Sequence, residues 1–301
     1  CWTPWNGILT SCQKMKHIRR QPINPEMISA GPSRDLFIYY LKGRLTAASG
    51  MFQNNFIGTW QEEDDSFIFF SSPAARQIEN LLNHQHQLSY VDSYEMSYDQ
   101  WLGEVFSTFE HGKFRITPAW ESGAGGTGDD KIGILLDPGL VFGTGTHPTT
   151  RDCLEALEVA ACSMAFKTVL DLGTGTGLLS LAAARLGSKR VVAVDLNLLA
   201  ARTAAKNVQL NQLADRVVIV QGKAEDIIAY PADLVIANIH FDVMRHLINT
   251  QGFLEKKRFI LSGLLRSEAK NIADRLARQP VKIKKQWSRD GIWHTFYGNA
   301  D

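Results

Sequence analysis

The chain has 301 residues, of which 45% are hydrophobic and 21% are charged, and its net charge is +1. This composition is typical of a globular protein with one large or two ordinary domains. No run approaches the roughly 20 apolar residues of a membrane span, and the four cysteines lack CxxC spacing, so we expect a cytoplasmic protein without membrane contact or a disulfide framework.

Residues 1–34 look least like a folded unit, because they mix turn formers with five Lys/Arg and a single acid. Their apolar stretch precedes the charges, which is the reverse of a secretory signal. We expect a poorly ordered N-terminal extension. The segment that begins at Met15 is typical of the start of a natural protein chain, so we expect that part of residues 1–14 is not native.

Residues 35–95 are predicted to form a small α+β domain. The expected strands are 36–42, 56–60, 66–70 and 88–91, and the expected helix is 73–83, with Ser72 as N-cap and Pro73 in its first turn. Residues 35–125 carry five Lys/Arg against twelve Asp/Glu. Such an acidic balance argues against direct nucleic-acid readout and suits a lysine-rich protein partner, although it also serves solubility alone.

Residues 96–130 are predicted to be a linker, with a helix over 98–109, a strand over 114–118 and a flexible glycine-rich loop over 122–128. From residue 131 a strand at 132–136 precedes a regular alternation of helices and strands, which predicts a doubly wound, mostly parallel sheet. From Thr149 we expect a helix to about residue 162, a strand that ends at 171, a helix that ends at 186, a strand that ends at 195 and a helix that ends at 210. Strands over 217–221, 232–237 and 259–261 and a helix from 267 are expected to follow. Segments 281–287 and 293–297 are predicted to close the sheet as an antiparallel pair.

The most informative stretch is V-L-D-L-G-T-G-T-G over residues 169–177. Its glycines permit the positive φ and the close approach to a ligand that a nucleotide site needs. Two features argue against a dinucleotide such as NAD. The third glycine of the dinucleotide-binding fingerprint is replaced here by Leu178, and Asp171 beside the turn would repel a pyrophosphate. That acid suits the amino group and sulfonium of S-adenosylmethionine. Asp195 ends the next apolar run, where it can accept ribose hydroxyls; a ligand-free glycine turn is the alternative.

Two further segments carry polar groups toward this site. Residues 137–150 read D-P-G-L-V-F-G-T-G-T-H-P-T-T, where Thr149 and Thr150 can cap the next helix or bind a ligand carboxylate. Asn238 follows a predicted strand, and ligands of open α/β sheets lie beyond the carboxyl ends of the strands. Its carbonyl can accept from a substrate amine and orient the nitrogen lone pair. His240 can remove a proton or be structural, and Phe241 can pack on a lysine chain or in the core.

The order and spacing of four motifs resemble those of the PrmA family of methyltransferases, which methylate a protein of the ribosomal stalk base. These motifs are D-P-G-L-V-F-G-T-G-T-H-P-T-T, V-L-D-L-G-T-G-T-G, V-D and A-N-I. The resemblance spans most of residues 36–301. It implies a class I S-adenosylmethionine-dependent methyltransferase fold behind a ferredoxin-like domain that recognises the substrate. On the basis of these motifs, the resemblance implies that Thr150, Gly173, Asp195 and Asn238 contact the cofactor. It places Phe142, Gly143, Thr144 and His147 in a loop that closes over the cofactor, and Asp171 and Gly175 in the glycine turn.

This chain departs from the family pattern at two places that border the acceptor site. Asn238 is followed by Ile-His-Phe instead of smaller residues, and residues 252–257 replace an expected Pro-Gly-Gly turn. These changes bear on the identity of the substrate more than on the chemistry.

The sequence therefore predicts a monomeric, metal-free enzyme that transfers methyl groups from S-adenosylmethionine to lysine ε-amines, and to an N-terminal α-amine, of a lysine-rich ribosomal protein. Asn238, His240 and Phe241 are the predicted catalytic residues. A methyltransferase for another protein lysine, or for a planar amide or nucleobase, is the first alternative. A non-catalytic protein that retains the cofactor fold is the second.

Overall fold

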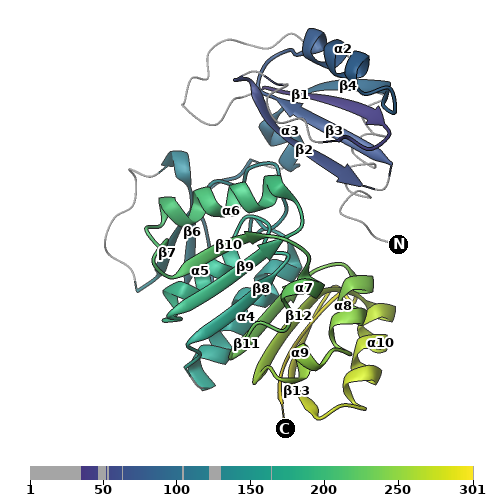
Figure 1. Ribbon diagram of the computed structural model, residues 1–301. Coiled ribbons are helices and arrows are strands. Elements are labelled where there is room, and N and C mark those ends of the chain that lie inside the picture. Colours follow the sequence, from purple (N-terminus) through teal and green to yellow (C-terminus); the bar gives the residue numbers. More distant parts are fainter. Residues whose placement is uncertain are drawn as a thin grey trace. The chain divides into compact units, whose positions relative to one another are not determined.

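A computed structural model describes residues 35–46, 52, 54–62, 64–103, 105–121, 130–163 and 165–300 (Figure 1). The predictions made for residues 1–34 and for the loop at 122–128 lie outside these residues. The predicted domain boundaries stay predictions.

The first sheet has four strands in the order β2-β3-β1-β4, all antiparallel to their neighbours. Its strands are β1 (Asp35–Lys42), β2 (Phe56–Glu62), β3 (Asp65–Phe70) and β4 (Ser89–Ser97). Helix α2 (Ala75–His84) links β3 to β4, and Ile78 and Leu81 pack on the sheet beside Leu41, Ile68 and Phe70. This order and pairing are those of a ferredoxin-like sheet, so the predicted α+β unit is confirmed.

Two local predictions for this part of the chain are wrong. Helix α2 begins after Ala74, which makes no side-chain cap hydrogen bond, instead of after Ser72. Helix α3 (Tyr98–Leu102) is a single capped turn instead of a helix to 109, because Gly103 ends it in the left-handed region at φ +79°. The chain then forms β5 (Phe109–His111), which pairs with β6 (Phe114–Pro118).

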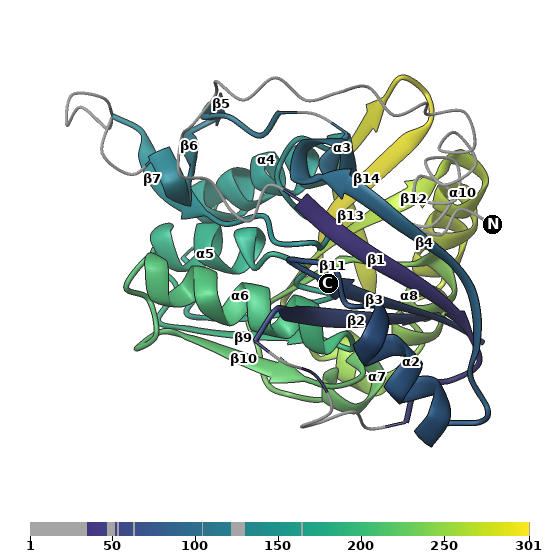
Figure 2. The ribbon, with the colours of Figure 1, turned by 90° about the horizontal axis from the view of Figure 1, so that it is seen from above.

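The large sheet has seven strands in the order β10-β9-β8-β11-β12-β14-β13, and all its neighbours are parallel except β12–β14 and β14–β13 (Figures 1 and 2). Its strands are β8 (Thr168–Leu172), β9 (Arg190–Asp195), β10 (Val217–Gln221), β11 (Leu234–Asn238), β12 (Arg258–Leu265), β13 (Val281–Arg289) and β14 (Trp293–Ala300). The order reverses between β8 and β11. The predicted doubly wound sheet with an antiparallel C-terminal pair is therefore confirmed.

Alternate residues of the inner strands enter two separate cores, as expected for strands covered by helices on both faces. Val169, Ala193 and Ile236 contact one core with α4 and α5, whereas Leu170, Val194 and Val235 contact the other with α8 and α10. The helices are α4 (Pro148–Ser163), α5 (Leu178–Arg185), α6 (Leu198–Leu210), α7 (Ala224–Ile227), α8 (Phe241–Leu247), α9 (Gln251–Leu254) and α10 (Arg266–Leu276).

A third sheet, β5-β6-β7, is joined by hydrogen bonds to two buried asparagines, Asn207 of α6 and Asn211 just after this helix. Asn211 accepts from the Leu135 N–H of β7 (Ile132–Leu136) at 3.0 Å and donates to its carbonyl at 2.7 Å. One turn earlier, Asn207 makes the same pair of bonds to Asp137 at 2.8 Å and also donates to the Thr176 carbonyl at 2.8 Å. These amides fix the path of the chain from β7 toward the glycine turn after β8. A short 3-10 helix, η1 (Ala119–Glu121), follows β6.

Candidate functional site

The turn between β8 and α5 needs its glycines for two reasons. Gly173, Gly175 and Gly177 have φ of +70°, +57° and +85°, a region that residues with a Cβ rarely adopt. A Cβ at Gly175 would also lie 2.3 Å from the Phe142 carbonyl oxygen, and one at Gly173 would lie 2.3 Å from the Ile239 side chain. The turn is thus in close contact with the segments before α4 and after β11.

The loop that precedes α4 is bound to this turn through its backbone. The Thr176 N–H donates to the Phe142 carbonyl at 3.0 Å, and the Thr176 hydroxyl donates to the Gly143 carbonyl at 2.6 Å. The Thr144 hydroxyl lies 2.8 Å from that of Thr146 within the same loop. Segments distant in the sequence therefore meet at one edge of the sheet, as the motifs predicted.

Asp195 ends β9 and points its carboxylate at the same turn. One oxygen accepts from the Gly175 N–H and the other from the Asn197 N–H, both at 2.9 Å. Burial raises the pKa of Asp195, and the two backbone hydrogen bonds lower it. A carboxylate oxygen can accept more than one hydrogen bond, so this group can still bind a pair of hydroxyls.

Asp171 lies under the turn and is 1% exposed. One of its oxygens accepts from the hydroxyls of Thr174 and Ser180, each at 2.6 Å. The other oxygen is buried and has no hydrogen-bond partner among the described residues. Burial raises the pKa of Asp171 to about 6, and the nearby Asp195 adds to that effect. The group is therefore ionised at pH 7, with one oxygen available to a cation or a donor.

The first turn of α4 is capped by His147, not by either threonine. The Thr149 N–H donates to His147 Nδ1 at 3.3 Å, and Pro148 fills the first helical position, where a missing N–H costs nothing. Of the two roles that the sequence left open for Thr149 and Thr150, capping of the helix is therefore not the one that the structure shows. Imidazole nitrogen takes that role, so both threonine hydroxyls are left for other contacts.

The Thr150 hydroxyl is buried and has no hydrogen-bond partner within the described part of the chain. The residue is 1% exposed, and its backbone N–H is already used by the His147 carbonyl at 3.1 Å. A buried hydroxyl without a partner is costly, so its place at the start of α4 points to a ligand acceptor such as a carboxylate.

Asn238, Thr149 and His147 form a chain of hydrogen bonds. His147 Nδ1 accepts the Thr149 N–H and is therefore unprotonated, in agreement with burial that lowers its pKa to about 4. The Thr149 hydroxyl, 2.8 Å from the same nitrogen, donates to it and in turn accepts from Asn238 Nδ2 at 3.4 Å. The Asn238 amide nitrogen thus faces α4, which directs its carbonyl oxygen away from the helix.

His240 and Phe241 contact the first turn of α8 instead. His240 Nδ1 accepts from the Asp242 N–H at 3.3 Å and caps the helix, and Arg245 lies over the Phe241 ring at 5.5 Å from its centre. Their proposed catalytic roles stay predictions.

Sequence reasoning missed two neighbours of the site. The Trp293 ring lies 5.0 Å from that of His147, which also contacts Phe142 at 5.1 Å. Gly263 has φ +83°, and a Cβ there would lie 3.0 Å from Asn238 Oδ1. Both residues come from the β12–β14 pairing, whose bulge between Leu261 and Leu264 no local pattern indicates.

Over the residues that the structure describes, no three His, Cys, Asp or Glu side chains gather so as to hold a metal ion. Within the same ranges, no helix has the length and apolar character needed to cross a bilayer.

The strand order, with a glycine turn after the first parallel strand and an acid at the end of the next, defines the class I methyltransferase fold. The family model described as "Ribosomal protein L11 methyltransferase (PrmA)" matches residues 54–300. The chain belongs to this family.

Relatives and a solved structure agree with this assignment. The ribosomal protein L11 methyltransferase of Pasteurella multocida is 33% identical over 250 residues, covering 76% of this chain and 81% of its own length. That of Anoxybacillus flavithermus is 39% identical over 175 residues, which are 58% of this chain and 55% of the relative. The chain thus spans about half the length of the first curated relatives. The crystal structure of ribosomal protein L11 methylase from Lactobacillus delbrueckii subsp. bulgaricus is 29% identical with a TM-score of 0.56, covering 65% of this chain and 99% of that one.

Proposed function

We propose that this protein is an S-adenosylmethionine-dependent N-methyltransferase that modifies lysine ε-amines, and an N-terminal α-amine, of ribosomal protein L11 or its equivalent. The observation that supports this most is the oriented amide of Asn238, held at the sheet edge where the glycine turn and the first turn of α4 meet. The names of the relatives supply the substrate, and the proposal extends that substrate to this chain.

The residues present suit the cofactor. Asp195 would accept the ribose hydroxyls, the unpartnered Thr150 hydroxyl would donate to the carboxylate, and the available Asp171 oxygen would face the amino group. Gly173 and Gly175 leave the space that a side chain would fill. We assign Phe142, Gly143, Thr144 and His147 to the loop over the bound cofactor, which supplies a methyl group on a positively charged sulfur.

The acceptor amine must arrive deprotonated, with its lone pair in line with the methyl group. The Asn238 carbonyl would accept a hydrogen bond from the amine and set that direction, and alignment of this kind contributes more to methyl transfer than a strong base does. His147 is neutral at pH 7 and holds the amide through Thr149, so it acts as a positioning residue. A substrate on the ribosome agrees with a cytoplasmic location, and the monomeric state stays a prediction.

Intact-mass spectrometry of unmethylated ribosomal protein L11 after incubation with this protein and S-adenosylmethionine tests the proposal. Gains in steps of about 14 Da, the composition of one added CH₂ group, are expected for the wild type. We expect Asn238→Ala to bind the cofactor with affinity within about threefold of wild type while turnover falls by about 100-fold or more, on the scale of lost transition-state contacts. Near-normal turnover in that variant would remove Asn238 from its assigned role.

A further inference from the structure

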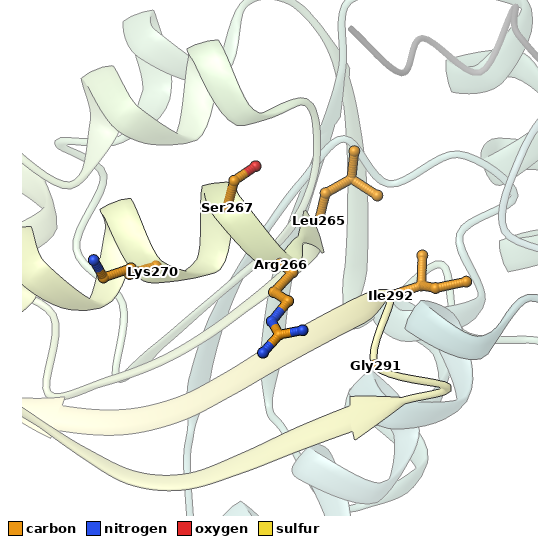
Figure 3. Close-up of a pocket in the computed structure, with 6 residues that line it drawn as sticks. All are labelled: Leu265, Arg266, Ser267, Lys270, Gly291 and Ile292. Atoms are coloured by element: carbon orange, nitrogen blue, oxygen red, sulfur yellow. The ribbon is translucent and has the colours of Figure 1, made fainter.

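A groove of about 640 Å³ lies between the start of α10 and the turn that joins β13 to β14 (Figure 3). It is lined by Leu265, Arg266, Ser267, Lys270, Gly291 and Ile292. In Figure 3 Leu265 and Ile292 point the same way from its two sides, Arg266 reaches toward the hairpin, and Lys270 lies one turn further along α10.

The groove lies on the same edge of the sheet as Asn238. Strand β12 is parallel to β11 and pairs Ser262 with Asn238, so both strands end at this edge. Three residues on, Leu265 pairs with Trp293, whose ring contacts that of His147. Strand spacings of about 4.8 Å and rises of about 3.3 Å per residue place the groove about 10 Å from the Asn238 amide.

Two exposed cations line the groove. Arg266 and Lys270 are exposed, lie four residues apart on α10, and make no ion pair or side-chain hydrogen bond within the residues described. Like charges at this spacing weaken a helix by a few tenths of a kcal/mol. The nearby acids Glu268, Asp274 and Asp290 form no ion pair with either cation within the described residues, and the Glu268 carboxylate instead accepts from the Leu265 N–H at 2.8 Å.

The other half of the groove is apolar. Ile292 is 51% exposed although it is a large aliphatic side chain, and it lies beside the half-buried Leu265. An occupant that meets both halves carries a negative charge and an apolar side chain a few ångströms apart. A protein segment with an acidic and an apolar side chain fits this description, and inorganic phosphate alone would leave Ile292 without a contact.

We propose that this groove binds the stretch of the acceptor protein next to the target amine, and that it selects an Asp or Glu two to four residues away from that amine. A lysine side chain reaches about 6 Å, and each extended residue adds about 3.3 Å, so a segment in the groove can present its lysine to Asn238. This inference rests on the proposed function and adds to it a determinant of substrate choice.

Binding of fluorescent peptides to the full chain tests the groove without requiring turnover. The probes are two peptides with one central lysine and a neighbouring leucine, one with glutamate and the other with glutamine three residues from the lysine. For the wild type we expect the glutamate peptide to bind about two- to fivefold more tightly, which is the range that a solvent-exposed ion pair allows. In Arg266→Gln/Lys270→Gln the two affinities should become equal, and Lys282→Gln/Lys284→Gln on β13 serves as the matched control.

Equal binding of both peptides by the wild type would overturn the inference, as would a preference that survives in the groove variant. Displacement of the glutamate peptide by a uridine 12-mer through Arg266 and Lys270 would also overturn it, because the groove would then be a phosphate site. Mass spectrometry of the same mixtures tests the proposed function separately. Selective binding without methylation would contradict that function and leave the groove assignment standing.

Discussion

At the residue scale, the orientation of the Asn238 amide depends on the hydroxyl of Thr149. This hydroxyl accepts from Asn238 Nδ2 at 3.4 Å and lies 2.8 Å from His147 Nδ1. Thr149→Val keeps the shape of the side chain but leaves the amide nitrogen without its partner. We expect turnover to fall by about 10- to 100-fold, equivalent to about 1.5–3 kcal/mol for a buried polar group. Cofactor affinity measured by calorimetry should stay within about threefold.

Thr149→Ser restores the hydroxyl and should recover most of the turnover. A purely structural role for Thr149 predicts the opposite pattern, in which the valine variant retains activity and the loss follows thermal stability. Equal turnover of the valine variant and the wild type would therefore break the link between Thr149 and Asn238.

The burial of the Asp171 carboxyl can be tested through the pH dependence of the protein's stability. Burial raises its pKa to about 6 from the ordinary 3.8, so the folded protein holds this proton more tightly than the unfolded chain does. The free energy of unfolding is therefore lowered as pH rises from about 4 to 6, by about 3 kcal/mol for the two-unit shift. Asp171→Asn lacks this titration, so the cofactor-free variant should gain stability relative to wild type between these pH values.

Urea unfolding of both proteins from pH 4 to pH 8 measures this difference. Burial lowers the pKa of His147 to about 4, so its titration raises the free energy of unfolding as pH rises over nearly the same range. This contribution is the same in both proteins and cancels in their difference. The same substitution should weaken cofactor binding at pH 7. A difference in stability that does not vary with pH would show that Asp171 is not held as the structure describes.

At the scale of elements, Asn207 of α6 connects three segments. Its amide satisfies both backbone groups of Asp137 and the Thr176 carbonyl, all at 2.8 Å, and the residue is fully buried. Asn207→Leu would leave these three groups without partners, and we expect a loss of about 3–5 kcal/mol in the free energy of unfolding. Gln209→Leu, on the exposed side of the same helix, should change it by less than about 0.5 kcal/mol. Equal effects in urea unfolding would contradict the connecting role.

The sequence predicts well those elements that are marked by a local pattern, an apolar run followed by turn residues, that recurs along the chain. Strands β8, β9 and β11 are short apolar runs, and each is followed by a clear turn signal. The helix predicted over 98–109 is wrong because Gly103, in the left-handed region, ends α3 after a single turn. The site was predictable in its glycines and acids. Its cap by His147 was not, because imidazole rarely serves as an N-cap and its position depends on contacts with Phe142 and Trp293.

At the scale of the whole molecule, negative and positive charge are concentrated in different parts of the chain. Residues 35–125 carry a net charge of −7, whereas residues 126–301 carry +4. Long-range attraction raises the rate at which a lysine-rich substrate meets an acidic surface, and salt screens that attraction within about 8–10 Å. If the proposed substrate is correct, KM for the ribosomal protein should rise with ionic strength while kcat stays nearly constant.

Neutralising two exposed acids of the α+β unit, Glu79 on α2 and Glu95 on β4, isolates this effect. Glu79→Gln/Glu95→Gln should raise KM about two- to fivefold at 50 mM salt and have little effect at 500 mM, where screening already removes the attraction. Glu225→Gln/Asp226→Asn, at two exposed acids of α7, is the control and should leave KM unchanged at both concentrations. A KM that is independent of salt, or equally sensitive to the control, would assign the acidic surface to solubility alone. The cationic groove beside Asn238 would then be the remaining charged determinant of substrate choice.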